Sequence, residues 1–398
     1  MKRNIIITGG GLVNKGAQAM TFITVSELTK KFPNHRILLL SPTDLQRPVN
    51  ERECYTFDFI GWYPQKFAKC QKNPLLRLIC RLKNGAELAQ AEQIYKNTDL
   101  MVDISGYAIG SNWTEKVCND YLDSFEFAHA FDIPVYVMPQ SFGPFDFKGE
   151  AGQHIDKRIR QLFPKIKVVC AREKEGFDAM TTIYGLNNVR LLPDLVLNSK
   201  SVDLKSIFKY DQALVVPDVN EAAVAVIPNS RNIEVGDAKE VYAKYKLMID
   251  HILKTGRSVY ILKHSGLDTD ICKNLKALFA DNDKVILLEQ EMNCLEFNEF
   301  VKKMDFLIAS RFHSIVHAYK NGIPCIALGW AVKYHDLLSM FGQEQYMFDV
   351  RNAESTEQIC AAIELMNNNY KNESQSILNS LSNIQENNVF DVINQIKV

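Results

Sequence analysis

Short apolar runs alternate with longer amphipathic stretches along most of this chain. Each run is rich in Ile, Val and Leu and is closed by Gly, Pro or a polar residue, as buried parallel strands are. In the first half the strand-like runs stand at 5–7, 36–40, 100–106, 134–138, 168–173 and 189–192. Helical periodicity fills the intervals at about 17–31, 115–131 and 173–183. Strand followed by helix, repeated, predicts a parallel sheet built from βαβ units.

The same rhythm restarts after a polar stretch without periodicity at 198–221. Strands are predicted at 223–227, 259–264, 285–288, 305–309 and 325–328, and helices at 238–254, 333–340, 355–366 and 371–396. Asparagine-rich joins separate the last two helical patterns. We therefore predict an α/β protein with two Rossmann-like domains, residues 1–205 and 206–398, that face a central cleft in the GT-B manner.

Composition excludes several classes of protein. The 398 residues are 46% hydrophobic and 23% charged, with a net charge of -1, so no basic field suggests nucleic acid. No apolar run approaches the roughly 20 residues that span a bilayer. Only three apolar residues follow Asn4, too few for a secretory signal. Nine scattered cysteines without a C-x-x-C pair predict reduced, mostly buried thiols, no metal site and a cytoplasmic location.

The first strand runs into a glycine-rich loop, Gly9-Gly10-Gly11-Leu-Val-Asn14-Lys-Gly16. Glycines at this position permit either a tight turn or close approach of the backbone to a ligand, and Asn14 is a candidate ligand-binding residue. The spacing is not G-x-G-x-x-G, and the second strand ends at Leu40 before Ser-Pro, without an acidic residue for a ribose hydroxyl. Both features argue against NAD.

The turn Ser310-Arg311-Phe312-His313-Ser314 lies between a predicted strand and a predicted helix. A helix N-terminus attracts anions, and Arg311 adds a planar fork for phosphate or carboxylate. His313 adds a group that can move a proton near neutral pH. The turn is therefore a candidate site for chemistry on an anionic donor. A salt-bridged helix cap is the alternative.

Further polar residues end the other predicted strands. Because the carboxyl ends of parallel strands form the binding crevice of open sheets, we expect these side chains to line a common rim. In the first domain they are Asp103, Gln140, Ser141 and Arg172, and in the second they are Arg231, His264 and Lys333. A carboxylate, an amide and a hydroxyl suit a polyhydroxylated acceptor, and the cations suit a ligand with phosphate and carboxylate groups. Asp103 as a turn carboxylate and Arg172 in an ion pair are the alternatives.

Residues 66–83 form a basic amphipathic stretch. Its cations are Lys66, Lys69, Lys72, Arg77, Arg81 and Lys83, interleaved with Phe, Leu and Ile. The pattern is typical of a helix that touches an anionic membrane face or a lipid-linked substrate, and equally of a solvated helix face. Peripheral contact with the inner face of the cytoplasmic membrane is one interpretation.

Six short motifs, taken together and in order, resemble those of the polysaccharide pyruvyltransferase family. They are Gly-Gly-Gly-Leu-Val-Asn-Lys-Gly-Ala-Gln-Ala (9–19), Pro-Gln-Ser-Phe-Gly-Pro-Phe (139–145), Ala-Arg-Glu (171–173), Pro-Asp-Leu (193–195), Ser-Arg-Phe-His-Ser (310–314) and Gly-Trp-Ala-Val-Lys-Tyr (329–334). They span most of the chain. One departure is Ala17, where many relatives carry an acidic residue.

The resemblance implies phosphoenolpyruvate as donor, with no further cofactor required, and a pyruvate ketal on a sugar as product. The acceptor would be a galactoside or another hexose of a cell-surface polysaccharide, such as a capsule or exopolysaccharide, or of its lipid-linked precursor. By resemblance Arg311 and His313 occupy the donor motif, Arg231 is a further donor-binding residue, and Asp103 belongs to the acceptor side.

Two other functions remain open on the sequence alone. A GT-B glycosyltransferase with a nucleotide-sugar donor would share the fold and the anion site, and a non-catalytic glycan- or anion-binding protein would share the scaffold. The sequence decides neither the sugar, the hydroxyl pair and the ketal stereochemistry, nor whether the protein is a homo-oligomer.

Overall fold

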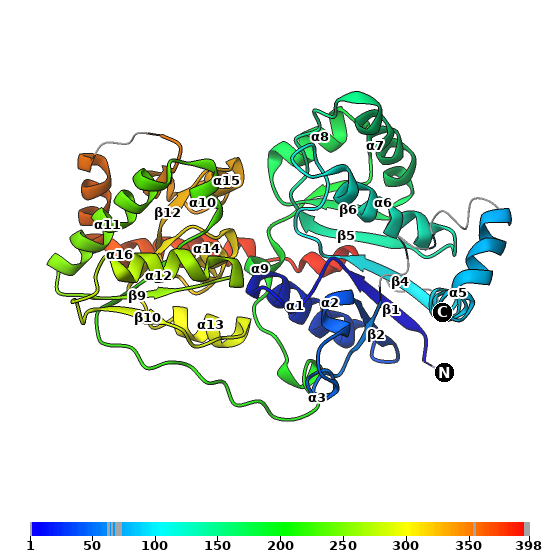
Figure 1. Ribbon diagram of the computed structural model, residues 1–398, viewed down its shortest axis with the longest axis horizontal. Coiled ribbons are helices and arrows are strands. Elements are labelled where there is room, and N and C mark those ends of the chain that lie inside the picture. The colour runs from blue at the N-terminus through cyan, green and yellow to red at the C-terminus, as the bar shows by residue number, and fades with distance from the viewer. Residues whose placement is uncertain (1, 62–63, 65–66, 68–73, 353–355, 394–398) are drawn as a thin grey trace.

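Two parallel sheets stand side by side in this computed structural model, which describes residues 2–61, 64, 67, 74–352 and 356–393 (Figure 1). The first sheet has the order β3-β2-β1-β4-β5-β6-β7 and the second the order β10-β9-β8-β11-β12-β13. All pairings between these strands are parallel. In both sheets the order reverses beside the first strand of the domain, which is the Rossmann-like arrangement and confirms the predicted fold class.

The strands of the first sheet are β1 (Asn4–Thr8), β2 (Arg36–Leu40), β3 (Asp58–Ile60), β4 (Thr98–Asp103), β5 (Val135–Gln140), β6 (Val168–Ala171) and β7 (Val189–Leu191). Those of the second are β8 (Ala223–Ile227), β9 (Ser258–Leu262), β10 (Val285–Leu288), β11 (Phe306–Ala309), β12 (Cys325–Gly329) and β13 (Met347–Asp349). The three-residue edge strands β3 and β13 are absent from the sequence prediction, because so short a run carries no periodicity.

The helices of the first domain are α1 (Lys15–Lys31), α2 (Pro42–Leu45), α3 (Val49–Glu53), α5 (Pro74–Lys96), α6 (Glu115–His129), α7 (Gly149–Leu162), α8 (Lys174–Thr182) and α9 (Leu195–Asn198). Those of the second are α10 (Arg231–Val235), α11 (Ala238–Lys254), α12 (Thr269–Ala277), α13 (Cys294–Val301), α14 (Phe312–Lys320), α15 (Val332–Ser339) and α16 (Thr356–Ile384). Short 3-10 turns are Phe163–Lys165, Leu204–Ser206, Gly266–Asp268, Glu344–Tyr346 and Val389–Val392.

Alternation along the strands assigns each side chain to one face of its sheet. In β1, Ile5 and Ile7 face one core and Ile6 faces another, as a period of two requires. The first of these cores does not stop at the domain boundary. It continues through helices α1, α13 and α14 onto the second sheet, so the two domains share apolar contacts. Their relative position is therefore set by packing and not by the linker alone.

The C-terminal segment differs from its prediction. Residues 355–366 and 371–396 were expected to form two helices, but α16 runs unbroken from Thr356 to Ile384. Asparagine costs only a fraction of a kcal/mol in a helix, and packing of α16 on α11 and α14 outweighs it. The expected boundary between residues 205 and 206 falls in the segment that joins β7 to β8.

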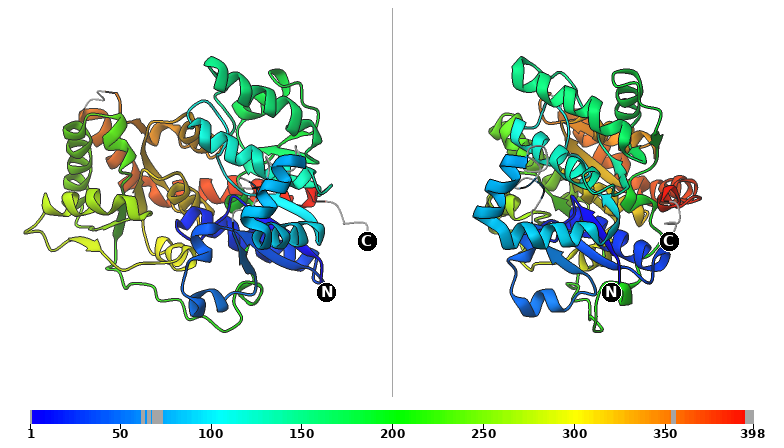
Figure 2. Two further views of the ribbon diagram at one scale, coloured as in Figure 1. Left: turned by 45° about the vertical axis from the view of Figure 1, so that its right-hand side comes forward. Right: turned by 90° about the vertical axis from the view of Figure 1, so that its right-hand side faces the viewer.

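After α16 the chain crosses from the second domain to the first (Figure 1; Figure 2, left). Buried Asn198, at the end of α9, holds it there. The Asn198 amide donates to the carbonyls of Ile384 (2.8 Å) and Asn387 (2.7 Å), and its oxygen accepts from the backbone N–H of Val389 (2.9 Å). Lys31 of α1 adds a bond to the carbonyl of Phe390. The segment thus fastens the domains together on the side of α9.

The basic stretch at 66–83 is only partly described. Lys66, Lys69 and Lys72 lie outside the described residues, as do the side chains of Arg77, Arg81 and Lys83. Among the described side chains of α5, the exposed large apolar ones are Leu75, Leu78, Ile79 and Leu82. Within the described chain, no helix combines the length and the apolar character needed to cross a bilayer.

We predict that Asn198→Ala lowers the free energy of unfolding by about 2–4 kcal/mol, because it leaves buried carbonyl and N–H groups without partners. Urea denaturation measures the change. Asn50→Ala, at an exposed position, is the control and should stay within about 0.5 kcal/mol of the unmodified protein. Equal stability of the two variants would show that the segment after α16 is not held by Asn198.

Candidate active site

The turn at 310–314 forms as the sequence predicts. Strand β11 ends at Ala309, and Arg311 is the N-cap residue of α14. Buried Ser310 fixes the turn: its carbonyl accepts from Asn229 (3.1 Å) and from the Tyr334 hydroxyl (2.9 Å). The backbone that presents Arg311 and His313 is thus held by side chains from two neighbouring segments.

Arg311 lies in a fork-to-fork pair with Asp268, which sequence analysis did not single out. Its Nε donates to Asp268 Oδ2 (3.0 Å) and its Nη2 to Oδ1 (2.5 Å). Asp268 is fully buried and also accepts from the backbone N–H groups of Ser230 and Ser265. The carboxylate therefore orients the guanidinium and offsets part of its charge.

His313 lies where the two domains touch. A Cβ atom added at Gly16 would come within 2.5 Å of the His313 ring, so only glycine fits opposite the imidazole. Burial, and then the charges of Arg172 and Lys333, lower the pKa of His313 to about 3. Its Nε2 has no partner in the described chain. With this pKa the imidazole is neutral near pH 7.

Lys333 is a cation whose charge acts on His313. It lies over the rings of Phe312 (5.5 Å) and of Tyr107 (5.8 Å), the latter from the first domain. Burial, and then the charge of Arg172, lower the pKa of Lys333 to about 8. Among the described residues no carboxylate pairs with it. A buried ammonium in this condition favours an anionic ligand.

Arg172 is placed at the rim but is already paired. Its Nη1 donates to Asp194 (3.1 Å), its Nε to Glu173 (2.8 Å), and Ser141 accepts from the same guanidinium. The guanidinium carbon lies 4.3 Å from the centre of the Phe312 ring, which is a cation–π contact between the domains. Arg172 is therefore in an ion pair, which was the alternative to ligand binding that the sequence left open, and Ser141 is one of its hydrogen-bond acceptors.

On the first-domain side, Asp103 is buried at the end of β4. It accepts hydrogen bonds from Ser105 (2.6 Å), Tyr121 (3.1 Å) and Gln140 (3.2 Å). Burial raises the pKa of Asp103 to about 6, against the hydrogen bonds, which lower it. Asp103 and Gln140 therefore come together as expected, and Tyr121 of α6 is a member of the cluster that the sequence did not reveal.

The glycine-rich loop connects this cluster to His313. Gly9 has a φ of +76°, and a Cβ there would meet Ser105 at 2.1 Å, while Gly16 abuts His313 at the other end. Asn14 caps α1 by accepting from the N–H of Ala17 (2.8 Å). The glycines of the loop therefore allow both a tight turn, at Gly9, and a close approach of another side chain, at Gly16. Asn14 has a capping role.

Lys15 is a cation at the domain contact that the sequence analysis did not single out. From the first domain its ammonium reaches the backbone carbonyls of Lys263 and His264, at 3.4 Å each. Burial lowers its pKa. The His264 ring packs edge-on against Phe297 (5.3 Å), and its Nε2 has no described partner. Lys15 and His264 thus meet across the domain contact.

The side chain of Arg231 is exposed and already has a partner. Its side chain is 61% exposed and pairs with Glu234 in α10 at 2.5 Å. The backbone, however, belongs to the same rim, since the neighbouring Ser230 donates to the carboxylate that holds Arg311. No group of three described His, Cys, Asp or Glu side chains could hold a metal ion.

The fold is that of the GT-B class of glycosyltransferases and sugar-nucleotide epimerases. Similar solved structures include the spinosyn rhamnosyltransferase SpnG with thymidine diphosphate (12% identity, TM-score 0.52, 96% of each chain). Others are S. aureus MnaA with UDP (11%, 0.56, 98% of this chain and 94% of that one) and UDP-GlcNAc 2-epimerase from Methanocaldococcus jannaschii (14%, 0.54, 92% of each). At these identities the likeness concerns the fold alone.

The sequence pattern of the polysaccharide pyruvyl transferase family matches residues 14–331. The chain belongs to this family of transferases, as its motifs suggested. The matched region contains the turn at 310–314 and all the candidate site residues except Lys333. No curated protein matches the chain by sequence.

We predict that Gly16→Ala disturbs the contact between the domains, because the new methyl group overlaps the His313 ring. Overpacking of this kind costs about 1–3 kcal/mol. Thermal unfolding measures the loss, and small-angle X-ray scattering detects any separation of the domains. Gly266→Ala is the control, since a Cβ there meets nothing within 4 Å. Unchanged melting and scattering of Gly16→Ala would contradict the contact.

Proposed function

We propose that this protein transfers the enolpyruvyl carbons of phosphoenolpyruvate to two hydroxyls of a sugar, forming a pyruvate ketal and releasing phosphate. The observation that carries the proposal is the set of cations at the contact between the domains, in a chain of this family. Lys333 and Lys15 lack carboxylate partners in the described chain, and the charge of Arg311 acts on Lys333. A small ligand with both phosphate and carboxylate groups matches this charge.

In the proposed reaction His313 protonates the methylene carbon of the donor. The charge that develops at the adjacent carbon accepts one sugar hydroxyl, the bond from that carbon to the phosphate oxygen breaks, and the second hydroxyl closes the ketal. One hydroxyl proton replaces the proton that His313 gave, and the other leaves with phosphate. Arg311, with Arg231, binds the anionic groups, and Asp103 accepts a proton from the acceptor or orients it.

His313 must gain a proton before it can act as an acid. The low pKa of His313 comes from burial and from the charges of Arg172 and Lys333. Bound phosphoenolpyruvate would bring several negative charges to the same place and so raise the pKa of the imidazole. Donor binding would thus favour the protonated form of His313, which is the form that acts as the acid.

The acceptor is proposed to be a galactoside or another hexose carried on a lipid-linked oligosaccharide. The exposed Leu75, Leu78, Ile79 and Leu82 of α5 support contact with a membrane surface, where such a substrate resides. A cavity of about 720 Å³ between the domains, which Arg172 and Glu173 help to line, offers room for a sugar near the rim.

His313→Ala should lower turnover by about 10²–10⁴-fold, the contribution of a positioned acid, while donor affinity changes less. The assay is release of inorganic phosphate from phosphoenolpyruvate in the presence of free and lipid-linked β-galactosides and other hexosides. His154→Ala, at an exposed site on α7, is the control. Activity that requires a nucleotide sugar would favour a glycosyltransferase, and donor binding without turnover would favour a binding protein.

The affinity for phosphoenolpyruvate should fall as pH rises through about 8, where Lys333 loses its proton and with it its positive charge. Lys333→Arg should move this fall above about pH 10, because a guanidinium stays charged. The measurement is the dissociation constant of phosphoenolpyruvate as a function of pH. A fall that stays near pH 8 in Lys333→Arg would contradict the role of Lys333.

A further inference from the structure

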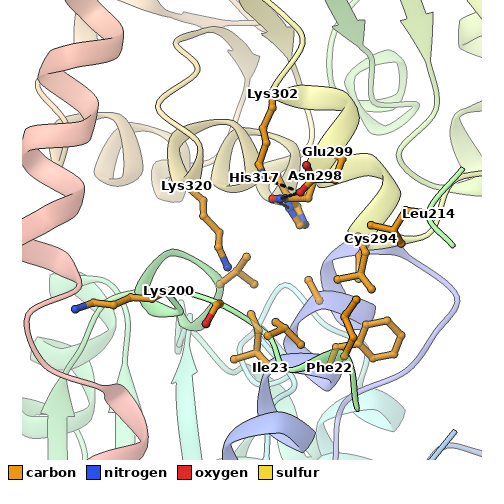
Figure 3. A pocket seen from close by; sticks show the side chains of 16 residues that line it. Phe22, Ile23, Lys200, Leu214, Cys294, Asn298, Glu299, Lys302, His317 and Lys320 are labelled. Carbon is orange, nitrogen blue, oxygen red and sulfur yellow. Dashed lines mark hydrogen bonds and ion pairs between the residues drawn. The ribbon is translucent and has the colours of Figure 1, made fainter. Parts of the chain in front are cut away.

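A cavity of about 290 Å³ lies between the domains, and none of the candidate active-site residues lines it (Figure 3). Side chains of α1 and of the segment after α9 form its first-domain wall. Side chains of α13 and α14 form the opposite wall. The proposed transfer reaction uses none of the residues that line it.

Lys320 provides the cavity with an unpaired charge. It is the last residue of α14, and its ammonium group points from that helix toward the first domain (Figure 3). Burial lowers the pKa of Lys320 to about 8. In the described chain no hydrogen-bond acceptor or carboxylate partners it, whereas Lys302 at the same cavity pairs with Glu299. A desolvated ammonium without a partner favours an anion.

The remaining wall is mostly apolar. Phe22, Ile23 and Val196 of the first domain face Leu295 of α13 across the cavity. A cavity of about 150 Å³ with such a lining holds a benzene molecule, so this one has room for an apolar ring with an anionic group attached. His317 also lines the cavity, and its Nδ1 lies 3.4 Å from Asn298 Oδ1. The cavity therefore has the charge of Lys320 and an apolar wall, and this combination fits a ligand with an anionic group and an apolar body.

We propose that this cavity is a second ligand site, for a small organic phosphate or carboxylate with an apolar body, and that its occupant draws the two domains together. The same two helices serve both sites. Helix α14 presents His313 to the active site and Lys320 to the cavity, and α1 presents Gly16 to the first and Phe22 to the second. A ligand that touches both walls therefore strengthens the contact on which the active site depends.

This proposal does not rest on pyruvyl transfer, and its test requires no turnover. Phenyl phosphate is the probe, and titration calorimetry on the full chain is the measurement. Lys320→Met should weaken binding by about 10- to 100-fold, the effect of losing one charged hydrogen bond in a buried site. Lys320→Arg should retain binding, and Lys239→Met, an exposed substitution on α11, is the matched control.

Phenyl phosphate could also occupy the donor site, so the titration is repeated with Arg311→Met. Binding that survives Arg311→Met and is lost in Lys320→Met supports the cavity. The opposite pattern, or equal binding in both variants, overturns it. Thermal unfolding verifies that each variant folds, and Lys320→Gln replaces Lys320→Met if the latter does not. In the unmodified protein the probe should also raise the melting temperature, and benzyl alcohol, which lacks the anionic group, should not.

Discussion

Positive charge buried between two domains, with too few carboxylates to balance it, is the constraint on which this structure depends. Arg172 and Arg311 are matched by Asp194, Glu173 and Asp268. Lys15 and Lys333 have no such partner in the described chain. An ammonium group that loses water without gaining a counterion is costly, and the lowered pKa of each lysine expresses that cost. An anion bound between the domains would remove it, so ligand binding and domain contact are expected to be linked.

The strands and their polar ends could be predicted from the sequence because buried parallel strands are continuous apolar runs. Such runs place Asp103, Gln140 and Arg311 at one edge of their sheets without knowledge of the packing. What could not be predicted is which charges are already paired. Asp268 lies 43 residues from Arg311, and no local pattern connects them. The same holds for Lys15, which in sequence is one more residue of a glycine-rich loop.

The glycine-rich loop shows how one segment can couple two distant groups. Gly9 packs on Ser105, which bonds Asp103, and Gly16 packs on His313 of the other domain. Helix α1, which follows the loop, has no acidic residue in its first turn.

The low pKa of His313 follows first from burial and then from the charges of Arg172 and Lys333, and it does not contradict an acid role. A buried imidazole beside Arg172 and Lys333 holds a proton only weakly. In the proposed reaction, a donor with phosphate and carboxylate groups would bring negative charge beside the ring and would raise the pKa of His313. His313 would then be protonated only with the donor bound. Burial, which lowers the pKa of His313, would also strengthen the attraction between the protonated imidazole and the bound anion.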